Sequence, residues 1–194
     1  SADRQRPTYG FTSVYNLRPT DVAKNPDGSW ANTDAGKAAA RMIDGGDTNE
    51  NTTSLQTTNK LDLFFLNKDL TITGEYTFRK EYKKDHWDGR KYQIGLGPNL
   101  MDEQVSSDYA YERLGENKYS TINVYATYNK EFADKHNLTA IVGYNREENQ
   151  YERFWANRDD LISPDLPNIA LATGEQTVGW SYSDWALSGY FYRL

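Results

Sequence analysis

Apolar and polar residues alternate along the chain from Leu70 onward. The even positions are mainly apolar or aromatic, whereas the odd positions are Thr, Glu and Arg. Successive side chains of a strand point to opposite faces, and a helix would instead place Leu70 and Ile72 on different sides. Turn-forming residues occupy positions 67–69, directly before this segment. The pattern therefore predicts a β-hairpin with strands at 60–66 and 70–83.

The same alternation returns later in the chain and predicts a second hairpin. Its strands are expected at 119–132 and 137–148, joined by a turn at 133–136. A fifth strand is expected at 180–194, where aromatic residues are dense but alternate less regularly. The sequence thus predicts an all-β fold in which the strands form an antiparallel up-and-down meander.

The two faces of the predicted sheet differ in chemistry. We assign the apolar face to Ile72, Tyr76, Phe78, Ile122, Val124, Leu138 and Val142. We assign the polar face to Thr73, Glu75, Arg79, Asn123 and Thr139. A shift of one residue in the pairing would exchange the faces, so the register should be tightly specified.

Residues 1–58 show no clean alternation and are expected to be mostly loop. Within them, residues 34–42 can form a short helix capped by Asp34, and residues 44–58 form a polar stretch. The strands are then expected to occupy residues 59–194.

The connections between the predicted strands differ greatly in length. Those within the hairpins are short, whereas the predicted loops at 84–118 and 149–179 each exceed 30 residues. Connections longer than about 12–15 residues are uncommon in compact domains. Alternation alone fits either a soluble antiparallel sheet or a membrane barrel with a lipid-facing side. Short turns at one end and long loops at the other favour a segment of a large outer-membrane β-barrel.

Composition narrows the classes of function. The chain has 194 residues, a net charge of −6, no cysteine and no basic run, which argues against a nucleic-acid partner and excludes disulfides and thiolate metal sites. No apolar run approaches the about 20 residues of a membrane helix. The chain carries 15 Tyr, 5 Trp and 7 Phe, as expected of aromatic girdles in a barrel or of surfaces that stack on sugars.

Three stretches resemble one known family. YSTINVYATYNKEFADKHNLTAIVGY (119–144), DLISPDLPNIALATGEQ (160–176) and WALSGYFYRL (185–194) are similar to barrel stretches of the SusC/RagA family of TonB-linked outer-membrane transporters. NPDGSW (25–30) and the first hairpin are similar to the preceding barrel region. The resemblance is collinear from about residue 20 to the end of the sequence.

This resemblance implies a barrel of about 22 strands with an internal plug. It also implies uptake of glycans or peptides powered through TonB, a SusD-like lipoprotein partner and a location in the outer membrane of a Gram-negative cell. The sequence contains no TonB box, plug or closing strands, so we expect a fragment of the barrel region whose function belongs to the parent protein. A soluble β-rich carbohydrate-binding module is the alternative.

Catalytic, metal and cofactor sites are not expected. Paired acidic residues such as Glu147 and Glu148 are strand neighbours that point to opposite faces, whereas glycoside hydrolysis needs two carboxylates facing one another. His86 and His136 have no partner at metal-ligand spacing, and Gly95-Leu96-Gly97-Pro98 is not a phosphate loop. We therefore do not expect an enzyme.

Aromatic residues with polar neighbours occur in the predicted long loops and form our candidate ligand site. An aromatic ring covers the apolar face of a sugar while amides and charges bind its hydroxyls. The alternative is that the rings anchor a loop or contact a lid protein. The candidate residues are Trp30, Trp87, Asp88, Trp155, Asn157 and Arg158.

Overall fold

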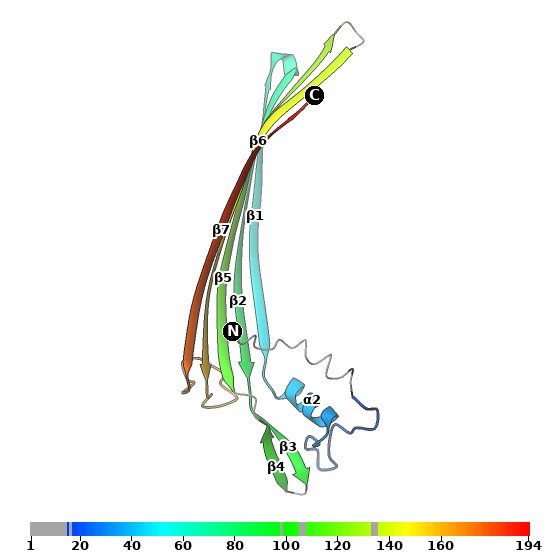
Figure 1. Ribbon diagram of the computed structural model, residues 1–194, viewed down its shortest axis with the longest axis vertical. Coiled ribbons are helices and arrows are strands. Elements are labelled where there is room, and N and C mark those ends of the chain that lie inside the picture. The colour runs from blue at the N-terminus through cyan, green and yellow to red at the C-terminus, as the bar shows by residue number, and fades with distance from the viewer. Residues whose placement is uncertain (1–14, 16, 98, 105–107, 133–135) are drawn as a thin grey trace. The chain divides into compact units, whose positions relative to one another are not determined.

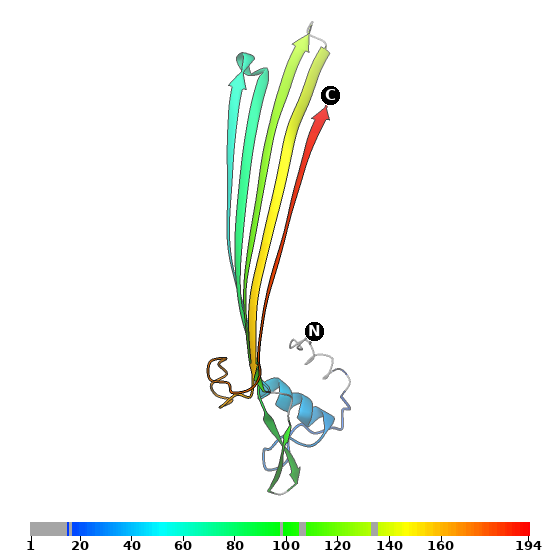
Figure 2. The same cartoon turned by 60° about the vertical axis from the view of Figure 1, so that its left-hand side comes forward.

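Five long strands form a single open sheet. The computed structural model describes residues 15, 17–97, 99–104, 108–132 and 136–194, with the backbone alone at residues 103 and 104. The sheet contains β1 (Thr48–Phe65), β2 (Leu70–Gly89), β5 (Tyr109–Phe132), β6 (His136–Asp159) and β7 (Gln176–Arg193). Their order is β1-β2-β5-β6-β7, so β1 and β7 are the edges, and Figures 1 and 2 show the strands side by side in one layer.

The remaining elements of the described residues are small. They are the helix α2 (Asp34–Ile43), the single 3-10 turn η1 (Leu66–Lys68), and the antiparallel pair of β3 (Tyr92–Gly97) and β4 (Leu100–Gln104). No helix among the described residues is long and apolar enough to cross a membrane.

All five predicted strands are present, and the structure confirms the all-β antiparallel fold. The turn of the first hairpin is η1, where Leu66, Asn67 and Lys68 all have positive φ. Asn tolerates this left-handed conformation better than most residues. The turn predicted at 133–136 falls mainly on positions 133–135, which lie outside the described residues, and β6 begins at His136.

The predicted long loops are shorter than expected, because long strands extend into both of them. β2 continues to Gly89, and β5 already begins at Tyr109. β6 continues to Asp159 and β7 begins at Gln176, so only about half of the predicted 149–179 loop lies between strands. The strand ends were missed because charged and aromatic residues occupy both of their faces there. The hydrophobic period of two disappears although the backbone pairing continues.

The region before residue 59 also differs from the prediction. β1 begins at Thr48, within the predicted polar loop. Its residues 48–61 are all exposed, and they are mainly Thr, Asn, Ser and Gln, so no apolar alternation signalled a strand. Pairing with β2 overrides the weak strand propensity of Asn and Ser.

The helix lies where the sequence indicates, but its cap is different. The N-cap is Thr33 rather than Asp34, because the Thr33 side chain accepts a 3.0 Å hydrogen bond from the Gly36 backbone N–H. Asp34 instead lies in the first turn, where its charge complements the helix dipole.

The chain divides into two compact units. Unit 1 comprises residues 1–51, 84–113 and 155–179, and unit 2 comprises residues 52–83, 114–154 and 180–194. Within unit 1, α2 packs on β3 around a small buried core. The core side chains are Ala31, Ala35, Ala40 and Ile94.

Unit 2 has one polar face held together by cross-strand hydrogen bonds. Between β1 and β2, the Thr73 hydroxyl donates to the Asp62 carboxylate at 2.7 Å. Between β5 and β6, the Asn145 amide donates to Asn123 at 2.6 Å, and the Thr139 hydroxyl donates to Asn129 at 2.8 Å. Because side chains alternate along a strand, these contacts confirm the predicted polar face.

The opposite face of unit 2 is apolar and uncovered. Val142 is 58% exposed, and Val124 is 44% exposed. Tyr76, Ile122 and Leu138 are also exposed, whereas Ile72 and Phe78 are half-buried. Among the described residues of unit 2, no hydrophobic side chain is buried. A sheet with an uncovered apolar face needs another layer of protein, or an apolar medium, against that face.

An aromatic ring covers a glycine where β6 and β7 pair. A Cβ atom at Gly143 would lie only 2.3 Å from Cζ of Phe191, so the ring of Phe191 occupies the space that a side chain would fill. Such ring-on-glycine contacts fix strand register. By contrast, a Cβ at Gly189 on β7 would meet no atom within 4 Å.

We therefore expect Gly143→Val to destabilise the sheet and Gly189→Val to be tolerated. The first substitution forces Phe191 away and should lower the free energy of unfolding by about 1–3 kcal/mol. Urea unfolding of the full-length gene product in lipid vesicles, followed by tryptophan fluorescence, measures both variants. Equal effects of the two substitutions would show that Phe191 does not hold this position.

Candidate functional site

Three aromatic rings from three neighbouring strands form one stack in unit 1, which we call the aromatic row. Trp87 on β2 stacks on Tyr111 of β5 with ring centroids 4.6 Å apart and planes 12° apart. Trp155 on β6 stacks on the other side, with its centroid 5.9 Å from that of Tyr111 and an interplanar angle of 19°. The row therefore joins β2, β5 and β6 through side chains.

The outer faces of the two tryptophans are also in contact with the protein. The Arg113 guanidinium lies over Trp87, with Cζ 4.7 Å from the ring centroid. The same guanidinium is fixed by buried Asp85, whose carboxylate accepts a 2.6 Å hydrogen bond from Arg113 Nε. A Cβ atom at Gly179 would lie 2.4 Å from Trp155 Cε2, so this ring covers the glycine. The row thus offers ring edges, rather than free faces, to a ligand.

One polar atom of the row has no partner. Nε1 of Trp87 is buried and makes no hydrogen bond among the described residues. Asn157 is two residues beyond Trp155 on β6, so it points to the same face, and it is only 3% exposed. Its amide donates to the Asp159 carboxylate at 3.0 Å. The structure therefore gathers Trp87, Trp155 and Asn157 in one place.

The other predicted ligand residues lie elsewhere. Asp88 and Arg158 follow Trp87 and Asn157 directly on their strands and point to the opposite face. Arg158 Nε donates to the Gly174 carbonyl at 3.3 Å. Trp30 precedes α2, where its Nε1 donates to Asp44 at 2.6 Å.

The predicted loop location of these residues is also corrected. Trp87, Asp88, Trp155, Asn157 and Arg158 all lie on strands, and only Trp30 lies outside the long strands.

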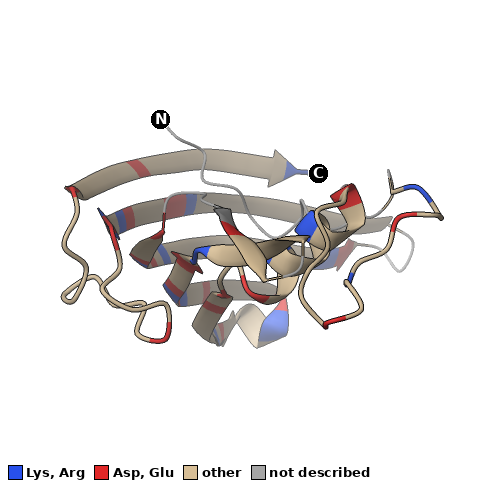
Figure 3. Cartoon of the chain, turned by 90° about the horizontal axis from the view of Figure 1, so that it is seen from below, with Lys and Arg blue, Asp and Glu red and all other residues tan. Residues whose placement is uncertain are grey.

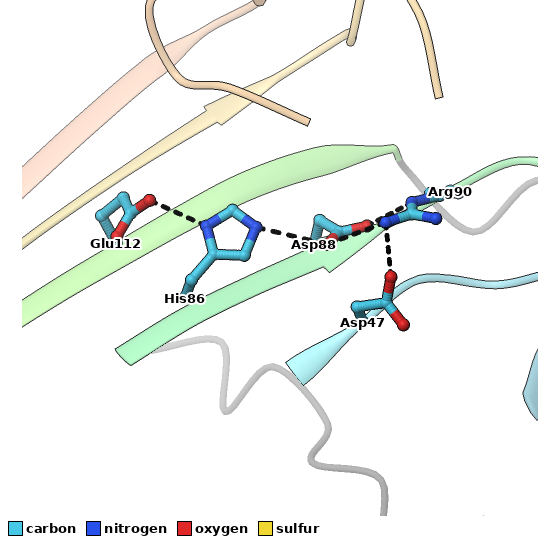
Figure 4. Close-up of polar contacts among 5 residues, drawn as sticks. All are labelled: Asp47, His86, Asp88, Arg90 and Glu112. Carbon is cyan, nitrogen blue, oxygen red and sulfur yellow. Dashed lines mark hydrogen bonds and ion pairs between the residues drawn. The ribbon is translucent and has the colours of Figure 1, made fainter. Parts of the chain in front are cut away.

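A charged network occupies the other face of the same strand ends (Figure 4). His86 Nδ1 lies 2.8 Å from Glu112 Oε1 on β5, and its Nε2 lies 3.3 Å from Asp88 Oδ1. Asp88 accepts a 2.6 Å hydrogen bond from Arg90 Nε, and Arg90 Nη2 donates to Asp47 at 2.7 Å. The charged network thus connects β5, β2 and the residue directly before β1.

Electrostatics within the charged network favour the charged form of Arg90. Burial opposes the charge of Arg90, but its hydrogen bond to Asp88 and its attraction to Asp88 and Asp47 raise the pKa of the guanidinium. A neutral imidazole has one N–H, so His86 can donate to one of its two carboxylate neighbours, whereas the protonated ring can donate to both. In the described residues, no group of three His, Asp or Glu side chains could hold a metal ion.

Several of these residues were missed by sequence reasoning. Tyr111 and Arg113 contact the candidate tryptophans, Asp85 binds Arg113, and His86 belongs to the charged network. Their signal is positional: His86, Asp88 and Arg90 recur at every second residue, and so do Asp85 and Trp87. This spacing places each set on one face only once β2 is known to reach Gly89.

Comparisons with known proteins identify the fold. No protein-family model matches the chain, and no curated protein matches it. The solved structure of the RagAB peptide transporter matches with a TM-score of 0.67 and 14% identity, over 89% of this chain and 18% of that chain. The RagAB peptide importer in the "open-open" state matches with a TM-score of 0.65 and 14% identity, over 80% and 16% of the two chains.

The chain therefore has the fold of a segment of a β-barrel transporter, and it spans less than a fifth of the length of the two matched chains. This result agrees with the SusC/RagA resemblance of the sequence. It concerns the fold, because identity is 14% in both matches.

The charged network yields a stability prediction. The Asp88 side chain is 1% exposed and holds both His86 and Arg90, whereas the Asp47 side chain is 73% exposed. Removing one partner of a buried ion pair leaves the other charge without a partner, so Asp88→Ala should lower the free energy of unfolding by about 3–5 kcal/mol. Asp47→Ala should cost at most about 1 kcal/mol. Chemical unfolding of the full-length gene product compares them, and similar losses would contradict a central role for Asp88.

Proposed function

We propose that this chain forms part of the barrel wall of a TonB-dependent outer-membrane transporter of the SusC/RagA family. The transporter would import peptides or glycans together with a SusD-like lipoprotein. The observation that carries the proposal is the two-faced sheet of unit 2. Its polar face is internally hydrogen-bonded, and its apolar face is exposed and has no core behind it.

Lipid is the natural environment for that apolar face. Outer-membrane barrels present an apolar band to lipid and a polar face to the interior, with alternation along each strand. The exposed side chains at Leu61, Val124 and Val142 lie on three different strands of the band. A crossing strand needs about 9–11 residues. β5 and β6 have 24 residues each, so they have ample length to cross and to continue into water.

A soluble carbohydrate-binding module fits the structure less well. Such a module would have to cover the apolar face and protect the free edges of β1 and β7. It would also need open ring faces for sugar stacking, whereas the faces of Trp87 and Trp155 are in contact with Tyr111, Arg113 and Gly179. These observations favour the transporter.

The partners follow from the fold match and the resemblance. The matched structures are described as those of a peptide importer and a peptide transporter, which makes peptides a ligand class to test beside glycans. A lipoprotein partner, coupling to TonB and a place in the outer membrane belong to the same proposal. Charged residues of both signs are interspersed on the strands and loops (Figure 3), as suits surfaces in contact with water and protein.

The ligand would approach the end of the strands that carries the aromatic row. η1 closes one end of β2, and short turns in outer-membrane barrels lie on the periplasmic side. Trp87 and Tyr111 lie within three residues of the opposite strand ends. We therefore place the aromatic row toward the extracellular side. Its ring edges and Asn157 would contact the ligand.

The lipid-facing assignment predicts how arginine substitutions on β5 behave. Val124→Arg would bring a charge into the apolar band and should reduce barrel assembly by about 2–4 kcal/mol if this position lies near the bilayer midplane. Thr121→Arg places the same side chain on the polar face and serves as the matched control. Folded barrel in outer-membrane fractions is measured for both. Normal assembly of the Val124→Arg variant would contradict the assignment of this face to lipid.

The ligand-contact assignment is tested by truncating one ring of the row. Trp155→Ala should reduce uptake several-fold, because an aromatic contact contributes about 0.5–1.5 kcal/mol beyond its buried area. Trp180→Ala removes an exposed tryptophan from the opposite face and should leave uptake unchanged. Growth on a peptide digest and on polysaccharides is measured beside surface abundance. Unchanged uptake by Trp155→Ala at normal abundance would assign the row a structural role only.

A further inference from the structure

The polar face of unit 2 has a gap at Gly115, in the middle of the sheet. Gly115 on β5 has no side chain, and a Cβ atom there would lie 3.7 Å from Lys83 Cβ on β2 and 3.9 Å from the Tyr151 hydroxyl on β6. The side chains of two neighbouring strands therefore stand on either side of a position without one. We call this place the Gly115 notch.

Two cations border the Gly115 notch. Lys83 flanks it with its Cβ atom, and Arg153 lies two residues beyond Tyr151 on β6, so it points to the same face. Among the residues that the structure describes, neither cation has an acidic partner. Arg153 Nε is also buried and has no hydrogen-bond acceptor in this part of the chain.

Two other cations on the same polar face lie near carboxylates. Lys60 lies 3.5 Å from Asp62 and 4.0 Å from Glu75. Arg79 Nε lies 3.7 Å from Glu81, which is within ion-pair distance, but it makes no hydrogen bond within the described part of the chain. A buried donor without an acceptor costs free energy, and the cost is larger for a charged group. Lys83 and Arg153 are thus two cations on neighbouring strands that have no carboxylate beside them among the described residues.

We propose that the Gly115 notch binds a carboxylate group of the transported ligand, an inference that rests on the proposed function. Lys and Arg side chains offer only donors, and the Tyr151 hydroxyl can add another. Such a set fits a ligand group that only accepts hydrogen bonds and carries negative charge. A carboxylate has this chemistry and can accept two parallel hydrogen bonds from one guanidinium. A neutral sugar would leave both positive charges uncompensated.

The carboxylate can come from an acidic peptide or from a uronic-acid glycan, and the experiment separates these sources. The full-length gene product, purified in lipid nanodiscs, is titrated calorimetrically with three probes. The probes are a hexapeptide of alternating Ala and Glu, its counterpart with Gln in place of Glu, and tetragalacturonate. We expect the Glu peptide or tetragalacturonate to bind more tightly than the Gln peptide.

Charge-neutralising variants locate this preference. Arg153→Gln and Lys83→Gln should each weaken binding of the acidic probe about threefold to tenfold, as expected for the loss of one charge-assisted hydrogen bond. Arg153→Lys, which keeps the charge, should retain part of the affinity. Lys84→Gln is the matched control, because it removes the same charge from the neighbouring residue on the opposite face of β2.

The outcomes separate this inference from the function on which it rests. If the protein is a membrane-embedded barrel that binds the Gln peptide as well as the Glu peptide, only the carboxylate site is overturned. If the full-length gene product is soluble without detergent, both the proposed transporter function and the carboxylate site that rests on it are overturned. If Arg153→Gln lowers the unfolding temperature much more than Lys84→Gln does while leaving probe affinity unchanged, the cations pair with an acidic group of the protein itself. That result also overturns the inference.

Discussion

The backbone ladder of the long strands is the constraint on which unit 2 depends. Its described residues bury no hydrophobic side chain, so apolar burial within the unit cannot be its main source of stability. Main-chain pairing and the cross-strand contacts of the polar face hold these strands together, as between Thr73 and Asp62. The ladder also imposes alternation, which sends every second side chain to the uncovered face. The same feature that joins the strands therefore creates the demand for a lipid or protein neighbour.

In unit 1 the alternation separates two kinds of chemistry within three consecutive residues. Trp87 belongs to the aromatic row, and its neighbours His86 and Asp88 belong to the charged network on the other face. The two sets share the backbone of β2 and β5, so a substitution that shifts these strands would disturb both. Rigid strands, rather than flexible loops, therefore position the candidate site.

The sequence could predict the fold wherever apolar residues marked one face. Apolar residues such as Leu70, Ile72 and Val124 marked the strands of unit 2, and the face of each side chain followed from whether its residue number is even or odd. The strand ends could not be predicted, because Trp87 and Asp88 are neither consistently apolar nor consistently polar by position. The start of β1 was hidden for a different reason, since its Thr and Asn residues are exposed on both faces. Tyr111 could be recognised as the centre of the row only after the pairing of β2 with β5 was known.

The ring-on-glycine contacts between β6 and β7 have a consequence for how a barrel would be built. Phe191 covers Gly143, and Trp155 covers Gly179, so each strand contributes one ring and one glycine. A slip of one residue would bring Phe191 against Val142 or Tyr144, whose side chains project from the opposite face and leave no matching gap. The pairing of β6 with β7 is thereby restricted to a single alignment before any later strand is added. The free edge of β7 would then be held in one position relative to β6. A strand that pairs with this edge would start from the correct register, and a register error would not propagate to later strands of the barrel.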